Sequence, residues 1–318
     1  MSELACLAPG WSGGHDDPEY GLSSYEGAQA RWCAGCGDHS VLTAVQRLLT
    51  SEQLVPEQTV FVSGIGCSSR FPHYLKTYGF HGIHGRALPV ATGIKLHRPD
   101  LTVFVVMGDG DCTSIGAGHW IHALRYNPDL TVLMLDNGIY GLTKNQTSPT
   151  TPLGWASNTQ PRGSWLPALN PLSLALGVTN ASFVAQTAEW VPGHLYATLR
   201  AAYRHPGLAF VRILQRCPVF TPALYQLAVQ DPARITLVVH DDGVVVPELD
   251  KVYRSQQVHD PADLAAARLL ADATERIHLG VLFRDPTRAR YEVVRRVAPR
   301  TGPERLALLN AELDRHAV

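Results

Sequence analysis

The sequence is poor in charge and in long apolar runs. Only 17% of its 318 residues are charged, and the formal net charge is -1. A chain without excess positive charge lacks the electrostatic footprint of a protein that binds nucleic acid or an anionic membrane, so we expect neither partner. The longest apolar runs, such as VFVVM and VLML, have the length of a strand, whereas a spanning helix needs about 20 apolar residues.

Cysteine is also scarce. Six cysteines are too few for a disulfide framework in a chain of this length. The first 30 residues contain no basic start followed by an apolar core, which a signal peptide would require. We therefore expect a cytoplasmic protein. The low charge fraction also leaves surface that a partner chain can bury.

Strand and helix patterns alternate after this N-terminal segment. Apolar residues recur at helical spacing in 41–49, and Asp38 or Ser40 is expected to cap that helix. Three continuous apolar runs follow, each ending in a glycine-containing or polar turn: TVFVSGIGC, LTVFVVMGDGD and LTVLMLDNGIYG. Continuous apolar strands separated by helices are typical of a parallel sheet covered on both faces. The sequence therefore predicts an α/β fold with a mostly parallel sheet.

The organisation of the rest of the chain is less regular. Residues 1–30 are expected to form an arm, 31–225 the main domain, and 226–318 a C-terminal extension that packs on the core or on a partner subunit. The segment 147–170 is rich in Pro, Ser, Thr and Asn, which is typical of a long functional loop.

Polar residues follow two of the predicted strands. Asp109 and Asn137 are separated by about one strand–helix–strand unit, so both are expected at the same edge of the sheet. A carboxylate and an amide oxygen suit a Mg²⁺ ion that also holds a diphosphate. Gly108 and Gly110 let the backbone approach phosphates closely, and a helix beginning near Thr113 would point its N-terminus at them.

The cysteines leave several metals open. Cys33 and Cys36 form a C-x-x-C pair, Cys67 follows the first glycine turn, and Cys217 precedes a proline. Four thiolates suit either a zinc ion or an iron–sulfur cluster, and the pair alone would suit dithiol chemistry. Spacing does not separate zinc from iron–sulfur. Cys6 and Cys112 are not expected to bind metal.

Five motifs, in this order, resemble the β subunit of the 2-oxoacid:ferredoxin oxidoreductases, and within that family the 2-oxoglutarate:ferredoxin kind. They are WCAGCGDHSVL, SGIGCSSRFPHY, HGIHGRALPVATGIKLHRPDL, GDGDCTSIGAGHWIHALRYN and DNGIYGLTKNQTSPTTPLG. They run almost unbroken from about residue 31 to 154 and continue more loosely to about 292. The resemblance implies the thiamine-diphosphate-binding fold, with a small C-terminal extension.

The resemblance also implies cofactor ligands. Mg²⁺ would be bound by Asp109, Asn137 and the backbone carbonyl of Ile139. Thiamine diphosphate would contact Asp111 and the turn that holds Gly66, Ser68 and Ser69. One [4Fe–4S] cluster would be bound by the four cysteines Cys33, Cys36, Cys67 and Cys217.

Several loop residues are candidates for contacting the substrate. A dicarboxylic 2-oxoacid needs two cationic sites, and Arg70 and Lys144 lie on loops at the expected active edge. His84, like Arg86, precedes a helix at the same edge and would contact diphosphate or substrate, or would instead be a structural histidine. Thr143 and Asn145 are weaker candidates for the pocket wall.

The implied reaction is the oxidative decarboxylation of 2-oxoglutarate with coenzyme A to succinyl-CoA and CO₂. Electrons would pass through the cluster to ferredoxin. No glutamate lies in a motif suited to face the aminopyrimidine ring, so an α subunit is expected to complete the site as αβ or a dimer of αβ. The alternatives are pyruvate or a broad 2-oxoacid as substrate, a non-redox thiamine enzyme with structural zinc, or a non-catalytic module with this fold.

Overall fold

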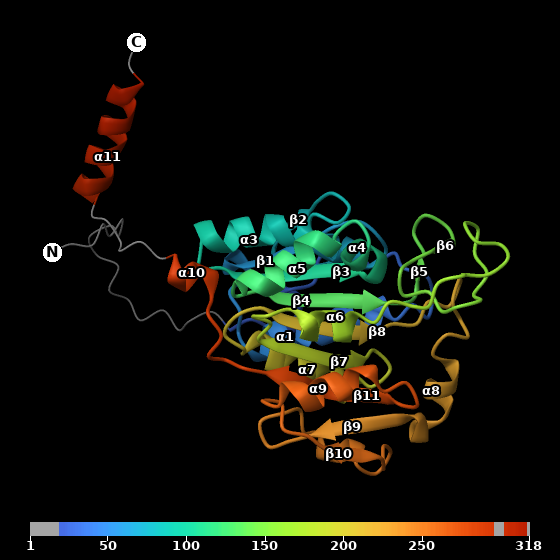
Figure 1. Ribbon diagram of the computed structural model, residues 1–318. Helices are drawn as coiled ribbons and strands as arrows, with labels where there is room; N and C mark the ends of the chain where they lie inside the picture. The colour runs from blue at the N-terminus through green and yellow to red at the C-terminus, as the bar shows by residue number, and fades with distance from the viewer. Residues whose placement is uncertain (1–18, 296–301, 317–318) are drawn as a thin grey trace.

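A nine-stranded sheet forms the centre of the computed structural model, which describes residues 19–295 and 302–316 (Figure 1). Its order is β10-β9-β11-β7-β8-β4-β3-β1-β2. The strands are β1 (Thr59–Ser63), β2 (Tyr78–His81), β3 (Thr102–Gly108), β4 (Thr131–Asp136), β7 (Phe183–Ala188), β8 (Ala209–Leu214), β9 (Ile235–Val239), β10 (Gln256–Val258) and β11 (Ile277–Arg284). Neighbouring strands run parallel, except that β11 is antiparallel to β7. A separate antiparallel pair joins β5 (Ile139–Tyr140) to β6 (Gln146–Thr147).

Helices cover both faces of the sheet, because β1, β4 and β7 are buried along their whole length and expose no polar face. The helices of one face are α3 (Ala87–His97), α5 (Ala117–Tyr126), α6 (Pro171–Gly177) and α9 (Leu264–Asp272). Those of the other face are α1 (Asp38–Ser51), α2 (Phe71–Tyr74) and α7 (Pro192–Tyr203). The remaining helices are α4 (Asp109–Thr113), α8 (Gln226–Gln230), α10 (Tyr291–Val294) and α11 (Gly302–Arg315). The predicted fold class is confirmed.

Two local predictions were wrong. The N-cap of α1 is Gly37, with no side-chain cap, and Asp38 is instead buried inside the first turn. The helix after GDGD begins at Asp109 rather than near Thr113, because the extended backbone of Gly108 (φ -80°, ψ 165°) caps it. That short helix, α4, ends at Thr113, and α5 begins at Ala117.

The C-terminal part of the chain extends the same sheet. Strand β11 lies beside β7, and β9 and then β10 follow it outward to one edge of the sheet (Figure 1). The division at residue 225 stays a prediction, and most of the expected arm at 1–30 lies outside the described residues. Among the described helices, none combines the length and the apolar character that a membrane span requires.

Two buried histidines make the fold sensitive to acid. His194 and His205 are each 2% exposed, and burial lowers the pKa of both to about 4. The unfolded chain therefore binds protons below about pH 6.5 that the folded chain excludes, so stability is complete above that pH and is lost as the pH falls toward 4. At pH 5 the loss is about 2 kcal/mol per histidine.

Urea unfolding at pH 7.5 and pH 5.0 measures this loss. The double variant His194→Gln/His205→Gln is expected to lose less stability than the wild type between the two pH values, whereas the exposed-site variant His97→Gln should behave like the wild type. An equal loss in the double variant and the wild type would contradict the assignment.

Candidate active site

The carboxyl ends of β1, β3 and β4 meet at one edge of the sheet. Gly108 at the end of β3 pairs with Leu135 of β4, so the residues that follow these two positions lie beside each other. A cavity of about 350 Å³ opens there, which we call the strand-end cavity. Its lining residues are Ile65, Gly66, Cys67, Ser68, His84, Gly108, Asp109, Gly110, Asp111, Asn137, Ile139, Tyr140, Gly141, Leu142, Thr143 and Gln146.

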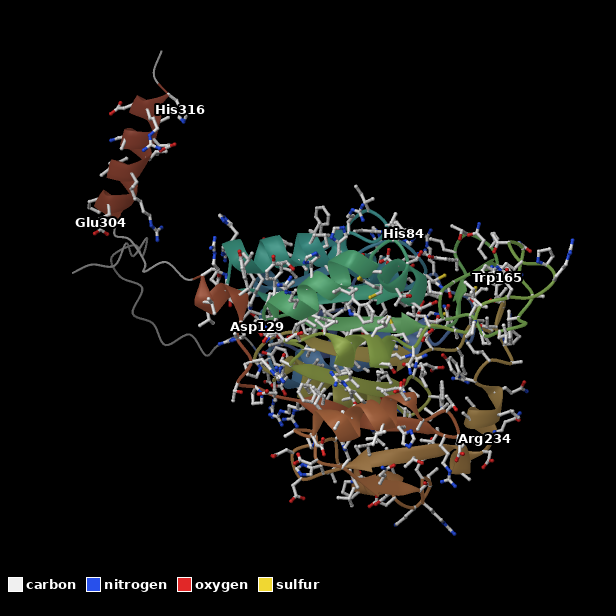
Figure 2. All side chains as sticks on the ribbon, in the orientation of Figure 1. His84, Asp129, Trp165, Arg234, Glu304 and His316 are labelled. Atoms are coloured by element: carbon white, nitrogen blue, oxygen red, sulfur yellow. The ribbon has the colours of Figure 1, made fainter. Side chains whose placement is uncertain are left out.

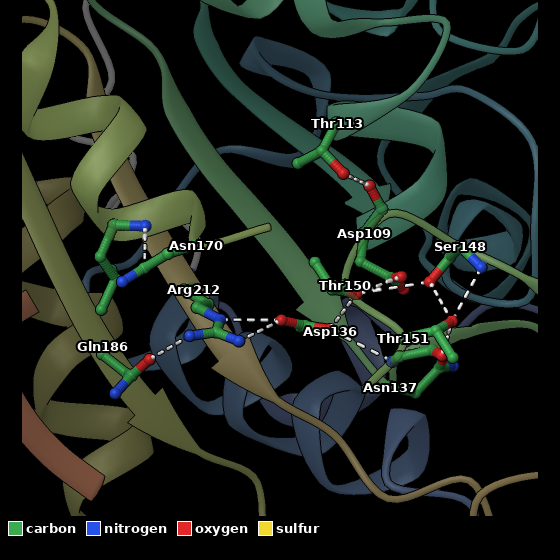
Figure 3. A network of polar contacts seen from close by, with 12 residues as sticks. Asp109, Thr113, Asp136, Asn137, Ser148, Thr150, Thr151, Asn170, Gln186 and Arg212 are labelled. Carbon is green, nitrogen blue, oxygen red and sulfur yellow. Dashed lines mark hydrogen bonds and ion pairs between the residues drawn. The ribbon is translucent and has the colours of Figure 1, made fainter. Parts of the chain in front are cut away.

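Asp109 carries a buried carboxylate at this edge. The Thr150 hydroxyl lies 2.7 Å from Asp109 Oδ2 and 2.9 Å from Asp136 Oδ1, so it donates to one carboxylate or the other (Figure 3). Burial, together with the Asp136 charge, raises the pKa of Asp109 to about 7. Two acidic side chains this close in a buried place favour a bound cation.

Asn137 follows β4 and connects the strand-end cavity to Gln215, the residue that follows β8. Its Oδ1 accepts the backbone N–H of Ile139 at 3.1 Å, and its Nδ2 donates to Gln215 Oε1 at 2.8 Å. Gln215 Nε2 in turn donates to Cys36 Sγ at 3.4 Å. The expected Mg²⁺ ligand Asn137 is therefore connected by hydrogen bonds to one of the expected cluster ligands.

Asp111 accepts hydrogen bonds from the backbone of two separate turns. Its Oδ1 accepts the backbone N–H of Gly85 at 2.7 Å and of Ile65 at 3.2 Å, and lies 2.7 Å from His84 Nδ1. Its buried Oδ2 has no hydrogen-bond partner among the described residues. Burial raises the pKa of Asp111 despite these donors. An unpartnered carboxylate oxygen beside the cavity is suited to a ligand that brings a donor.

The glycine turn after β1 lines the same cavity. Gly66 has φ 135°, a conformation that side chains rarely adopt, and Ser68 lies beside it in the lining. Ser69 does not line the cavity: it is fully buried, and its backbone carbonyl accepts the Ser63 hydroxyl at 2.6 Å.

The four cysteines of the expected cluster line a second cavity, of about 200 Å³, which we call the cysteine cavity. Its residues are Arg31, Trp32, Cys33, Cys36, Cys67, Arg70, Asn137, Gly141, Leu142, Lys144, Cys217, Pro218, Val219 and Phe220. Four of them, Cys67, Asn137, Gly141 and Leu142, also line the strand-end cavity. The two cavities thus share a wall.

The described cysteine thiols are unpaired, and Cys67 resists ionisation. The cysteines in the described part of the chain are all free thiols. Within residues 19–295 and 302–316, no three His, Cys, Asp or Glu side chains converge closely enough to hold a single metal ion. Burial, with a contribution from Asp38, raises the pKa of Cys67 to about 12.

The residues expected to contact the substrate are divided between the two cavities. His84 lines the strand-end cavity, as does Thr143. Arg70 and Lys144 line the cysteine cavity instead, although Lys144 lies on the β5–β6 loop that serves both. Asn145 and Arg86 line neither cavity.

Two residues of this site were missed in the sequence. Tyr140 lines the strand-end cavity, and its hydroxyl donates to the carbonyl of Gly110 at 3.0 Å. Thr150 lies in the SPTT stretch of the loop that was expected to be functional, but no role was predicted for this residue. The sequence did contain a signal for Thr150: the hydroxyl-rich stretch SPTT follows two strand-end acids, Asp109 and Asp136.

Gly110 leaves the space that Tyr140 occupies. A Cβ at this position would lie 2.2 Å from Tyr140 Cε1 and 2.4 Å from Cζ. Gly110→Ala is expected to displace the ring, to lower stability by about 1–3 kcal/mol and to weaken thiamine diphosphate binding. The matched control is Gly118→Ala in α5, where nothing lies within 4 Å and alanine should add about 0.5–1 kcal/mol. Thermal unfolding and calorimetric binding measure both effects; unchanged binding in Gly110→Ala would contradict the packing argument.

Comparison with known proteins agrees with this geometry. Residues 64–213 match the family described as thiamine pyrophosphate enzyme, C-terminal TPP binding domain. The chain is 47% identical over 232 residues to a 2-oxoglutarate oxidoreductase subunit KorB from Mycobacterium tuberculosis, a match that covers 72% of this chain and 62% of that relative.

Other relatives match over more of their length. The chain is 36% identical to the β subunit of a 2-oxoacid:ferredoxin oxidoreductase from Aeropyrum pernix, with 83% of each chain covered. A solved structure of a 2-oxoglutarate:ferredoxin oxidoreductase from Magnetococcus marinus, with 2-oxoglutarate, coenzyme A and succinyl-CoA bound, superposes with a TM-score of 0.77. Its identity is 31%, and the match covers 92% of this chain and 97% of that one. The chain therefore belongs to the β-subunit family of the 2-oxoacid:ferredoxin oxidoreductases.

Proposed function

We propose that this chain binds thiamine diphosphate, Mg²⁺ and one [4Fe–4S] cluster as the β subunit of a 2-oxoglutarate:ferredoxin oxidoreductase. The reaction converts 2-oxoglutarate and coenzyme A to succinyl-CoA and CO₂ and delivers electrons to ferredoxin, in either direction according to the supply of reduced carrier. The observation that carries this proposal is the wall shared by the strand-end cavity and the cysteine cavity, since the cavity proposed for thiamine diphosphate then lies next to four cysteine thiols.

The residues of the strand-end cavity fit Mg²⁺ and a diphosphate. Asp109, Asn137 and the Ile139 carbonyl are hard oxygen donors of the kind Mg²⁺ prefers, and the unpartnered Asp111 Oδ2 is available to a donor of the cofactor. Gly66, Ser68, Gly108 and Gly110 line the wall, where absent or small side chains admit phosphate oxygens. When bound, thiamine diphosphate supplies the electron sink that decarboxylation of a 2-oxoacid requires.

The substrate is held by cations that line the cysteine cavity, which shares a wall with the strand-end cavity. Arg70 and Lys144 are the candidates for its two carboxylates, and His84, held by Asp111, is a donor inside the strand-end cavity. Lys144 and Asn145 both have positive φ, 77° and 60°. Two consecutive non-glycine residues in this region store backbone strain, which is typical of functional loops.

We favour a [4Fe–4S] cluster over zinc in the cysteine cavity because the chain belongs to the 2-oxoacid:ferredoxin oxidoreductase family. Four thiolates would also suit a zinc ion, at about 2.3 Å from each sulfur. A [4Fe–4S] cluster holds its four thiolates apart around a body of iron and sulfide, and here four cysteines surround a cavity of about 200 Å³.

Metal analysis distinguishes the two. Protein purified without oxygen is expected to be brown and to contain about four iron and four sulfide per chain. The Cys217→Ser variant should lose most of the iron, whereas Cys112→Ser, at a buried position outside the cysteine cavity, should keep it. A colourless protein with stoichiometric zinc would contradict the cluster assignment.

The site is incomplete in this chain. No glutamate lines the strand-end cavity within the described residues, so the carboxylate that faces the aminopyrimidine ring comes from a partner. We assign it to the α subunit, in an αβ unit or a dimer of αβ, which also provides most of the coenzyme A site.

Co-expression with a candidate α subunit tests the function. The purified complex is expected to reduce ferredoxin with 2-oxoglutarate only when coenzyme A is present, and the chain alone should not. Equal or faster reduction with pyruvate would reassign the substrate to a broader class of 2-oxoacids. Absence of ferredoxin reduction with every 2-oxoacid, in a complex loaded with both cofactors, would contradict the redox function.

A further inference from the structure

A buried polar network is connected to Asp109 through Thr150. None of the other residues in it is an expected Mg²⁺ ligand. Asp136, which is fully buried at the end of β4, forms an ion pair with Arg212 of β8, with Oδ2 2.6 Å from Nη2 and 2.8 Å from Nε. Arg212 Nη1 also donates to Gln186 Oε1 at 3.1 Å, in β7 (Figure 3). The Asp136 carboxylate is thereby anchored across three adjacent strands, β4, β8 and β7. Figure 2 draws the side chains of the described residues on the ribbon, with His84 of the strand-end cavity labelled.

Thr150 connects this anchor to the expected metal ligand. Its hydroxyl lies between Asp136 Oδ1 and Asp109 Oδ2, and the residue is only 6% exposed. Asp136 is already satisfied, because Arg212 donates to its Oδ2 and the backbone N–H of Gly138 donates to its Oδ1 at 3.2 Å. The single proton of the Thr150 hydroxyl is therefore available to Asp109 Oδ2, and this hydrogen bond orients the Asp109 carboxylate. Figure 3 shows the three side chains in this order.

The neighbouring threonine fixes the same segment to the site loop. The Thr151 hydroxyl donates to the carbonyl of Gly138 at 2.6 Å and accepts the backbone N–H of Ser148 at 2.8 Å. Gly138 lies between Asn137 and Ile139, the other two expected Mg²⁺ ligands. The segment 148–151 therefore contacts both parts of the metal site.

We propose that Thr150, anchored by the Asp136–Arg212 ion pair, is a positioning residue that orients Asp109 for Mg²⁺ and thereby sets the affinity for thiamine diphosphate. This inference rests on the proposed Mg²⁺–diphosphate site. Partners that orient a ligand in this way typically account for about 10–100-fold in metal affinity, because an unoriented carboxylate must be ordered when the ion binds.

The test uses the complex with its α subunit, freed of thiamine diphosphate and Mg²⁺ with a chelator. Calorimetry then measures thiamine diphosphate binding over a series of Mg²⁺ concentrations. Thr150→Val keeps the shape and removes the hydroxyl, so the Mg²⁺ needed for half-saturation should rise about 10–100-fold. Thr150→Ser restores the hydroxyl and should return within about threefold of the wild type. The matched control is Thr198→Val, a buried threonine of α7 whose hydroxyl contacts His194, which should leave the Mg²⁺ requirement unchanged.

Unchanged Mg²⁺ dependence in Thr150→Val would overturn the inference, and so would an equal loss in the Ser and Val variants, since packing rather than the hydroxyl would then be responsible. If Thr150→Val does not fold, Thr150→Ala, which removes the hydroxyl without adding a methyl, replaces it with the same expectation. A wild-type complex that binds thiamine diphosphate without needing Mg²⁺, or not at all, would instead overturn the proposed function.

Discussion

The Asp109→Asn variant is expected to lose Mg²⁺-dependent thiamine diphosphate binding while keeping a folded chain. The substitution preserves the shape of the side chain and its contact with the Thr150 hydroxyl but removes the only charged oxygen ligand proposed for Mg²⁺. Because outer-sphere partners already account for about 10–100-fold, loss of this ligand should lower the affinity by at least about 100-fold, and turnover should fall with it.

The stability of the cofactor-free chain should move in the opposite direction. Asp109 is a buried carboxylate whose pKa is raised by burial and by Asp136, so its charged form is penalised in the absence of a cation. We expect the unfolding midpoint of cofactor-free Asp109→Asn to equal or exceed that of the wild type. Such a residue stabilises the bound state at the expense of the empty one, as functional acids commonly do.

Calorimetric binding and thermal unfolding of the same preparations provide the two measurements. Asp241→Asn, on the exposed surface, is the control and should leave both unchanged. Retention of Mg²⁺-dependent binding within about threefold in Asp109→Asn would remove Asp109 from the metal site.

The Arg212→Leu variant is expected to be strongly destabilised. The substitution leaves Asp136, which is fully buried, without its ion-pair partner and Gln186 Oε1 without its donor. Breaking a buried pair by removing one member typically costs about 3–5 kcal/mol. The loss should appear as an earlier urea midpoint with an unchanged slope.

An exposed ion pair offers the control. Arg98 also donates twice to a carboxylate, from Nε to Asp100 Oδ1 and from Nη2 to Asp100 Oδ2, but both side chains are more than half exposed. Arg98→Leu should therefore leave the unfolding free energy unchanged within the error of the measurement, because exposed pairs contribute little. An Arg212→Leu variant as stable as Arg98→Leu would show that Asp136 does not need its partner.

The order of elements and the family were readable in the sequence. Continuous apolar runs at 59–63, 102–107 and 131–135 have only one good solution, a parallel sheet buried on both faces, and the structure confirms it. The linear motifs from WCAGCGDH to YGLTKNQTSPTT likewise predicted the family that the comparisons show. The positions of Asp109 and Asn137 at one edge also followed from the sequence, since parallel strands bring their carboxyl ends together.

The sequence did not predict where helices begin or where short edge strands lie, because these features depend on contacts with neighbouring segments. Asp38 was expected to cap α1 but is buried within its first turn, and α4 begins at Asp109 because Gly108 is extended. A cap depends on backbone angles that neighbouring segments decide, and several short polar residues at a helix start compete for it. Strand β10 is three exposed residues without an apolar pattern, and only its pairing with β9, which in turn pairs with β11, identifies it.

By itself the sequence determined the residue types available to the site, because acids, amides, glycines and cysteines follow buried strands at fixed points in the chain. Only the tertiary structure decided which of them share a wall. It placed Cys67, Asn137, Gly141 and Leu142 between two cavities, assigned Arg70 and Lys144 to the cysteine side, and connected Thr150 to Asp109 over 41 residues of chain. The physical reason is that strand order and loop closure bring together residues far apart in the sequence, and no local pattern records these contacts.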